Sequence, residues 1–256
     1  MSLKLDHLVI NSHFALDKYS ALFRQLGFTL TPKGYHSLGS INHLIMFADS
    51  YLELIGLPEQ GEPLRRELLD SPPGLDGLVF ASHDAAGTER QLQSAGFRAH
   101  PVQHFSREVV SGQARGEARF SAVRLAAGSF PAGRVYFCQH HTPEWVWRDE
   151  WIQPGSIQRL TLVARNPQHT AEQYARLGET GLLKILSYAQ WQARHGELLP
   201  LADDRESRFA SITLSGLDPA PIVRGASALG LAQHQHNGQL SIALPDLALL
   251  LEFNHA

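Results

Sequence analysis

Apolar side chains recur every three or four positions over residues 15–26, which predicts a helix packed on a sheet. Short apolar runs on either side predict strands at 5–11, 42–47 and 51–56. Helix-like segments with the same ending return along the chain, each closed by a glycine that follows leucine or alanine. Such a glycine suits a left-handed helix C-cap. The four glycines are Gly27, Gly96, Gly178 and Gly230.

A strand candidate precedes each predicted helix, and further β-like residues follow it. The four strand candidates are 5–11, 78–82, 160–164 and 210–215. The resulting modules cover about 3–57, 75–142, 156–202 and 207–254. One strand–helix–strand–strand–strand module covers its own sheet poorly, so we expect two modules to pair around a cavity. We therefore predict an α+β fold of two module pairs with curved, cup-shaped mixed sheets. The predicted domains are 1–155 and a trimmed 156–256.

The composition is that of an ordinary globular protein, with 256 residues, 43% hydrophobic and 18% charged. A net charge of -3 argues against nucleic acid, whose binding depends on lysine and arginine contacts to phosphate. No apolar run approaches the ~20 residues that cross a bilayer, and the N-terminus lacks the apolar segment of a signal peptide. Cys138 is the only cysteine, which excludes an intrachain disulfide and favours a cytoplasmic location.

Several familiar chemistries leave no trace in the sequence. The chain has no Gly-x-Gly-x-x-Gly after a strand, no phosphate-binding Gly-Lys-Ser/Thr loop, no His-Glu-x-x-His and no Gly-x-Ser-x-Gly. We therefore expect no nucleotide cofactor and no serine nucleophile.

Two strand-like hexapeptides each carry one metal-competent side chain, His7 in residues 5–10 and Glu53 in residues 51–56. Burying either side chain without a partner would be costly. Both are therefore expected to face the interior of the cup or to have a partner there.

With these features the sequence resembles the vicinal oxygen chelate superfamily, and within it the glyoxalase-like domain proteins. Glyoxalases, bleomycin-resistance proteins and dioxygenases share the fold of this superfamily. The clear part of the resemblance covers about residues 3–155. The motifs that carry it are LDHLVI (5–10), LGF (26–28), GSINHLI (39–45), YLELI (51–55) and FCQHHTPEW (137–145).

The resemblance implies a divalent ion in the cup of the first module pair, held by residues of the first and last strands. Carried over by position, the ligands are His7 and Glu53, and Gly77 stands where a second histidine is expected. Gln139 is placed opposite Glu53, and strand alternation offers His141 as a further ligand. A mixed nitrogen and oxygen set of this kind suits Zn, Fe, Mn or Ni.

Other residues are expected to serve the substrate. Glu53 doubles as the proton carrier. Asn42 and His43 are expected to line the mouth of the cup, and Arg124 is a candidate partner for Glu53 or the substrate. The second half is expected to hold no metal and to serve structure or homodimerisation.

Three functions stay open. The first is a metal-dependent lyase or isomerase of glyoxalase type that acts on a small oxygenated metabolite. The second is a metal-free protein that binds or sequesters a small molecule in the same cavity. An extradiol-type dioxygenase is disfavoured, because its site needs two histidines and one carboxylate and Gly77 removes the second histidine.

Overall fold

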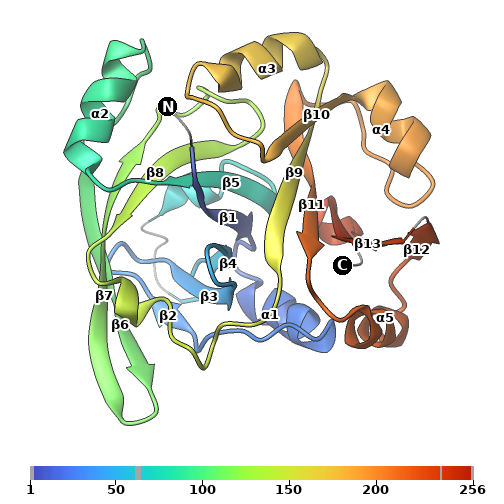
Figure 1. The fold of residues 1–256 in the computed structure, drawn as a ribbon, viewed down its shortest axis with the longest axis horizontal. Coiled ribbons are helices and arrows are strands. Elements are labelled where there is room, and N and C mark those ends of the chain that lie inside the picture. Colours follow the sequence, from blue (N-terminus) through green and yellow to red (C-terminus); the bar gives the residue numbers. More distant parts are fainter. Residues whose placement is uncertain (1–2, 61–64, 237, 255–256) are drawn as a thin grey trace.

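The chain folds into two twisted β-sheets with few helices (Figure 1). The computed structural model describes residues 3–60, 65–236 and 238–254. Over these residues, eight strands form the first sheet in the order β2-β3-β4-β1-β5-β8-β7-β6. The strands are β1 (Leu5–Asn11), β2 (Gly34–Tyr35), β3 (Ile41–Met46), β4 (Tyr51–Gly56), β5 (Gly74–Ala81), β6 (Gln103–Ser111), β7 (Ala114–Arg124) and β8 (Arg134–His140).

The second sheet has six strands within the described residues, in the order β10-β9-β11-β14-β13-β12. They are β9 (Ser156–Ala164), β10 (Leu183–Ser187), β11 (Ser207–Ser215), β12 (Gln233–His236), β13 (Gln239–Leu244) and β14 (Leu249–Asn254). The helices are α1 (Leu16–Gln25), α2 (Ala85–Ser94), α3 (Pro167–Ala175), α4 (Tyr188–His195) and α5 (Pro219–Ala228). None of the helices described is long and apolar enough to span a bilayer.

The predicted α+β fold with curved mixed sheets is confirmed, and so is the repeat behind it. All four predicted capping glycines have a positive φ, between 66° and 144°. The central strands of each sheet are an antiparallel pair, β1 with β5 in the first sheet and β9 with β11 in the second. Each of these four strands has a parallel neighbour on its other side, namely β4, β8, β10 and β14 respectively. The third module is trimmed, because β10 is its one strand after α3 and α4 follows directly.

The first sheet curves almost into a barrel. Its two edge strands, β2 and β6, approach each other at a β-bridge between His36 and Arg107. Next to this bridge the Ser37 amide donates to the Ser106 carbonyl at 2.8 Å. The near closure separates an enclosed concave interior from a convex outer face.

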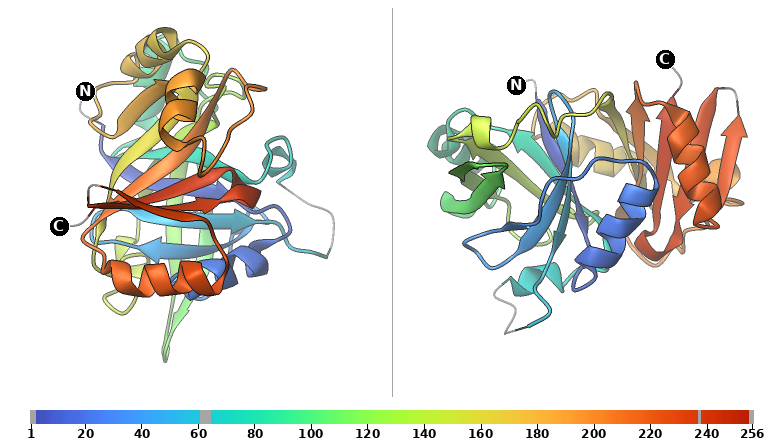
Figure 2. Two further views of the ribbon diagram at one scale, coloured as in Figure 1. Left: turned by 90° about the vertical axis from the view of Figure 1, so that its right-hand side faces the viewer. Right: turned by 90° about the horizontal axis from the view of Figure 1, so that it is seen from below.

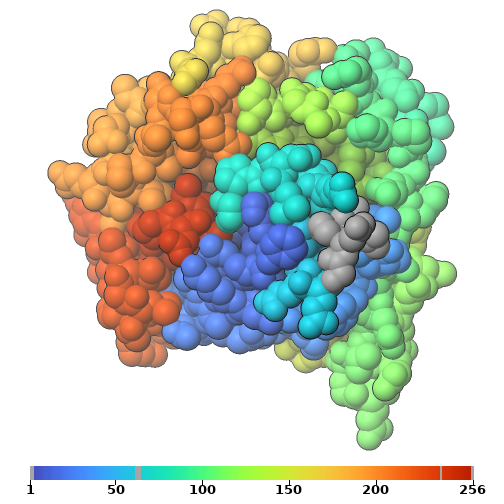
Figure 3. All heavy atoms as spheres, turned by 180° about the vertical axis from the view of Figure 1, so that it is seen from behind, coloured from blue at the N-terminus to red at the C-terminus, as the bar shows by residue number. Residues whose placement is uncertain are grey.

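The two sheets pack back to back (Figure 2). One continuous apolar core joins the convex face of β1 and β5 to β9 and β11, through residues such as Leu8, Leu78, Leu160 and Ile212. Beside this core, α1 lies against α5 (Figure 1). The second half therefore covers the back of the first cup, and Figure 3 shows the two halves in direct contact.

The concave face of the second sheet is filled by its own chain. Trp191 of α4 is buried there, and its indole Nε1 donates to the Leu199 carbonyl at 2.9 Å. Glu252 of β14 is also buried, and it accepts hydrogen bonds from Ser211 and Thr213.

Candidate functional site

The interior of the first sheet holds a small polar cavity of about 30 Å³. Its wall is built from inward-facing side chains on six strands and two loops. They include His7, His36, Asn42, Glu53, Arg107 and Tyr136. Apolar residues of the same strands, such as Leu8 and Leu54, point outward to the shared core. Strand alternation thus separates an interior with both polar and apolar side chains from an apolar exterior.

A β-bulge at Asp6 turns two consecutive side chains of β1 into contact with the concave side. Leu5 pairs with Phe80 and His7 with Val79, so Asp6 is an extra residue in the ladder. The carboxylate of Asp6 is 4% exposed and accepts from His7 Nδ1 at 2.5 Å and from His140 Nε2 at 3.0 Å. Burial alone would raise the pKa of Asp6, but the hydrogen bonds from both histidines hold it well below its usual range. Asp6 is therefore an anion that orients two imidazoles.

His7 points its second nitrogen at two oxygen atoms. Because Nδ1 is held by Asp6, Nε2 faces Tyr136 Oη at 3.3 Å and Glu53 Oε2 at 3.6 Å. The ring of Tyr51 stacks on the imidazole with centroids 4.4 Å apart. The ring is thus fixed both in its plane and in its rotation.

Glu53 is buried in β4 and oriented by an amide. Asn42 Nδ2 donates to Glu53 Oε1 at 2.7 Å. Burial raises the pKa of Glu53, but nearby His36 and His7 and the Asn42 hydrogen bond outweigh it, so the net shift is downward. The carboxylate is therefore ionised at neutral pH and can accept a proton or bind a cation.

His36 extends the network on the other side of Glu53. Its Nε2 lies 4.0 Å from Glu53 Oε1 and 3.3 Å from Asn42 Nδ2, while Nδ1 contacts Ser40 Oγ at 2.9 Å. Burial lowers the pKa of His36 to about 4, so the ring is neutral at pH 7. Ser40 in turn accepts from Arg65.

The structure brings four of the predicted site residues together, since His7, Asn42, Glu53 and Arg124 all line the cavity. His43 is not among them. It precedes Leu44 in β3 and points to the opposite face, where its Nδ1 donates to the Thr31 carbonyl at 2.7 Å.

Gln139 and His141 are also placed away from the cavity, which corrects their expected position. In β8 the residues that reach the concave side include Tyr136 and Cys138, so alternation turns Gln139 outward. There it accepts from the amide of Ala85, the first residue of α2, and donates to the His83 carbonyl. His141 contacts Ser121 Oγ at 2.6 Å beside an outer groove.

The register of the strands explains this difference. Glu53 pairs with Val9, and the symmetry-related residue Val79 pairs with Tyr136. Tyr136 is therefore the counterpart of Glu53, three positions before Gln139. Gly77 pairs with Val9 as His7 pairs with Val79, so it occupies the predicted place of a second histidine. A Cβ at Gly77 would lie 2.7 Å from Val9 Cβ.

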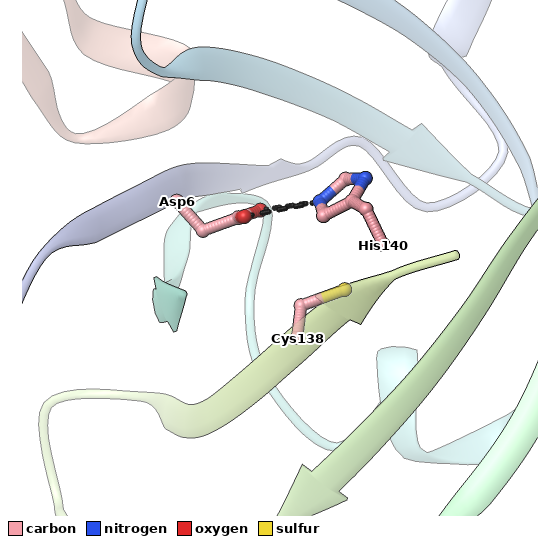
Figure 4. Close-up of side chains that lie close together, drawn as sticks. All are labelled: Asp6, Cys138 and His140. Carbon is pink, nitrogen blue, oxygen red and sulfur yellow. Dashed lines mark hydrogen bonds and ion pairs between the residues drawn. The ribbon is translucent and has the colours of Figure 1, made fainter. Parts of the chain in front are cut away.

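A second set of donor atoms lies at the edge of the cavity (Figure 4). Asp6, Cys138 and His140 offer oxygen, sulfur and nitrogen atoms within 4.8 Å of one another. Burial raises the pKa of the Cys138 thiol well above its usual value. Cys138 lines both the cavity and a neighbouring cleft of about 320 Å³, so this set stands between the two.

The donors around His7 fit a divalent ion. Tetrahedral ligands about 2.1 Å from an ion lie about 3.4 Å apart. The separations of 3.3 Å to Tyr136 and 3.6 Å to Glu53 bracket that value. An imidazole whose other nitrogen donates to a carboxylate is also the usual arrangement at metal centres.

Sequence reasoning missed four polar residues of this network: Asp6, His36, Tyr136 and His140. Asp6 was hidden by the bulge, because simple alternation puts neighbours on opposite faces. Tyr136 and His140 could have been found by aligning Glu53 with Tyr136 rather than with Gln139. No sequence signal marks His36, which follows the two-residue strand β2.

Comparisons with known proteins agree with this geometry. A family model described as a glyoxalase-like domain matches residues 5–178. No curated protein matches the chain in sequence.

Solved structures share the fold at low sequence identity. A hypothetical protein from Staphylococcus aureus superposes with a TM-score of 0.71 and 15% identity, covering 99% of this chain and 100% of that one. A mutant of 4-hydroxymandelate synthase from Streptomyces coelicolor gives 0.62 and 11%, covering 99% and 92%. A fusion protein of a xylose isomerase-like TIM barrel with 4-hydroxyphenylpyruvate dioxygenase gives 0.57 and 11%, covering 98% and 49%.

The matched segment contains β1 to β9, with both modules of the cup and its polar wall. The chain therefore belongs to the glyoxalase-like domain family of the vicinal oxygen chelate superfamily.

Proposed function

We propose that this protein is a glyoxalase-like lyase or isomerase that moves a proton on a small oxygenated metabolite in the first cup. The observation that supports it best is Glu53, a buried, ionised carboxylate that is oriented by Asn42 and faces the imidazole of His7. A fixed carboxylate beside a cavity is suited to general base catalysis.

The neighbours of Glu53 have complementary roles in this proposal. Burial raises the pKa of Tyr136, so its hydroxyl stays protonated and can donate to an oxygen of the ligand. Asp6 fixes the tautomer of His7, whose Nε2 faces the same space. Glu53 accepts a proton from the ligand and returns it to a neighbouring atom.

His7 and Glu53 would hold a divalent ion such as Zn, Ni, Mn or Fe. When bound, such an ion would polarise a ligand oxygen as a Lewis acid. The position of Glu53, between His7 and Asn42, leaves one carboxylate oxygen on each side for these two roles.

Metal analysis tests the ion. We expect about one ion per chain in protein purified without chelator, and its loss in the His7→Ala, Glu53→Gln double variant. Cys138→Ser is the control, because it removes a donor of the second set alone. If the purified protein contains no metal and its melting temperature does not change when Zn, Ni, Mn or Fe(II) is added, the result would favour a metal-free binding protein instead.

Solvent-deuterium exchange tests the proton transfer. Small hydroxy- and oxo-compounds incubated with the protein in D₂O should exchange a carbon-bound proton, followed by NMR, and Glu53→Gln should abolish the exchange. Binding of a compound without exchange in the wild type would contradict the enzyme and support sequestration.

An iron-dependent dioxygenase is a second candidate, because His36 places a second imidazole near Glu53, at 4.0 Å. The neighbours that share the fold include 4-hydroxymandelate synthase and a 4-hydroxyphenylpyruvate dioxygenase fusion. Oxygen uptake that depends on Fe(II) and is lost in His36→Ala would favour it over the isomerase.

A further inference from the structure

Arg107 is a buried cation that forms no ion pair among the described residues, although the negative charge of Glu53 acts on it. It points inward from β6, lines the cavity and is 4% exposed. Its Nη2 is buried and has no hydrogen-bond partner, and no carboxylate of the described residues forms an ion pair with it. An unpaired charge in a protein interior is costly, so such a group calls for an anion that the chain itself does not supply.

Arg124 is a second cation on the same cavity. Its guanidinium lies over the rings of Phe105 and Tyr136, 5.6 Å and 5.4 Å from their centroids, and donates to the neutral side chain of Gln103. Neither contact neutralises its charge. The third arginine of the cavity, Arg65, differs because it has a carboxylate partner in Glu67 at 2.7 Å.

The only carboxylate among the described residues that line the cavity is Glu53, and it is engaged by Asn42 and His7. Burial lowers the pKa of both Arg107 and Arg124, but a guanidinium group is effectively always protonated in proteins. Two guanidinium groups thus face a space that holds one occupied carboxylate. The electrostatics of the cavity favour an anionic ligand.

The size of the cavity selects among anions. About 30 Å³ holds two or three water molecules, since each water needs roughly 10–15 Å³ of such volume. At the two guanidinium groups a carboxylate places two oxygens, whereas a phosphate places up to four and needs more room there. Guanidinium groups also match the planar geometry of a carboxylate.

We propose that Arg107 and Arg124 bind the carboxylate of a small organic acid, which presents its adjacent carbon to Glu53. This inference rests on the proposed function, since it names the class of ligand for the same cavity. It also assigns Arg107 as the ligand-binding group of the edge strand β6.

Calorimetric titration with lactate, its neutral isostere lactamide and inorganic phosphate tests the proposal directly. We expect lactate to bind at least 10-fold more tightly than lactamide and phosphate. Arg107→Gln and Arg124→Gln should each weaken lactate binding by 10-fold or more. Arg115→Gln, on the exposed end of β7, is the matched control and should leave the affinity unchanged. Equal binding of lactate and lactamide, or tighter binding of phosphate, would overturn the proposal.

Thermal unfolding without ligand provides a second measurement. Removing an unpaired buried cation relieves the fold, so Arg107→Gln should melt at a higher temperature than the wild type while losing the rise in melting temperature caused by lactate. A fall in melting temperature together with an unchanged response to lactate would assign Arg107 a structural role and contradict the proposal.

Glu53→Gln separates the two proposals. It should keep lactate binding, because the arginines remain, while proton exchange disappears. Lactate binding that needs Arg107, without exchange in any variant, would leave the ligand class standing and reject the enzyme. Proton exchange on neutral compounds alone would support the enzyme and reject the carboxylate as the ligand class.

Discussion

Asp6 connects the two histidines of the site. It accepts from His7 and His140, and the bulge in β1 is what brings its side chain to them. A carboxylate that orients a metal-binding imidazole is worth about 10–100-fold in metal affinity. The role of Asp6 is therefore measurable apart from any substrate.

Asp6→Asn is expected to weaken Zn or Ni binding about 10–100-fold, because the amide can present a hydrogen to His7 Nδ1 and disturb its tautomer. Isothermal titration with each metal measures this. Asp49→Asn, on the exposed turn before β4, is the control. Equal metal affinities in the wild type and both variants would show that Asp6 does not support metal binding.

His36 predicts a pH dependence of stability. Its pKa is about 4 in the folded protein against an ordinary 6.5, so between these values the unfolded chain binds a proton that the folded chain does not. Stability should therefore fall as the pH drops from 6.5 to 4, by about 3 kcal/mol in total.

Urea unfolding at several pH values measures this effect. His36→Gln should flatten the loss of stability between pH 6.5 and 4, whereas His100→Gln, at an exposed position, should follow the wild type. An identical slope in all three proteins would show that His36 does not titrate in this window.

The paired central strands β1 and β5 set the geometry of the cup. Their register is symmetric about Leu8 and Leu78, and each strand has a bulge at an aspartate, Asp6 in one and Asp76 in the other. Asp76 pairs with Arg134 at 2.6 Å instead of a histidine. The same type of β-bulge therefore places an aspartate in the candidate site of the first module and in an ion pair of the second.

Gly77 lets β1 and β5 approach each other. A Cβ at this position would lie 2.7 Å from Val9 Cβ, so Gly77→Ala should destabilise the fold by about 1–3 kcal/mol in urea unfolding. Val9→Gly, which removes the clashing Cβ, should also cost stability alone, but in the double variant it should recover part of the loss. Additive effects of the two changes would contradict a direct clash.

Much of this architecture could be predicted from the sequence. The glycine-capped helices and the apolar periodicity marked the modules, and the helix predicted at 15–26 is α1 (Leu16–Gln25). The strand β6 was not predicted, because six of its nine residues are polar or charged, in a half-exposed pattern that is common in edge strands.

The candidate site was predicted only in part. His7 and Glu53 stand in strongly apolar strands, which made them conspicuous. Placing the partners needed the register of β8, and a three-residue error moved the expected ligand from Tyr136 to Gln139. Long-range pairing decides such a register, and hydrophobic pattern alone leaves it open when both faces are buried.

The two halves of the molecule share one apolar core. Leu8 and Leu78 of the first sheet and Leu160 and Ile212 of the second belong to the same cluster. We place the domain boundary near residue 155, where the chain passes from one sheet to the other, and infer that the largest core cannot be divided between the two halves.

Thermal unfolding should therefore be a single transition, with circular dichroism and tryptophan fluorescence changing together. A fragment of residues 1–155 should fail to fold cooperatively, because it exposes the convex face of β1 and β5. Gly225→Ala, which sets a methyl group against Gln25 and Leu26 of the first half, should lower the whole transition. Two separate transitions, or a stable fragment, would contradict the shared core.

The two modules carry different side chains at matching positions of the cup, and this difference has a stereochemical consequence. A cup built from two identical modules would accept a ligand in two opposite poses, related by its local twofold axis. Here His7 and Glu53 stand on one wall, and Gly77 and Tyr136 occupy the matching places on the other. The two prochiral faces of a bound molecule would therefore meet different side chains, so the proposed proton transfer would take place at one face alone.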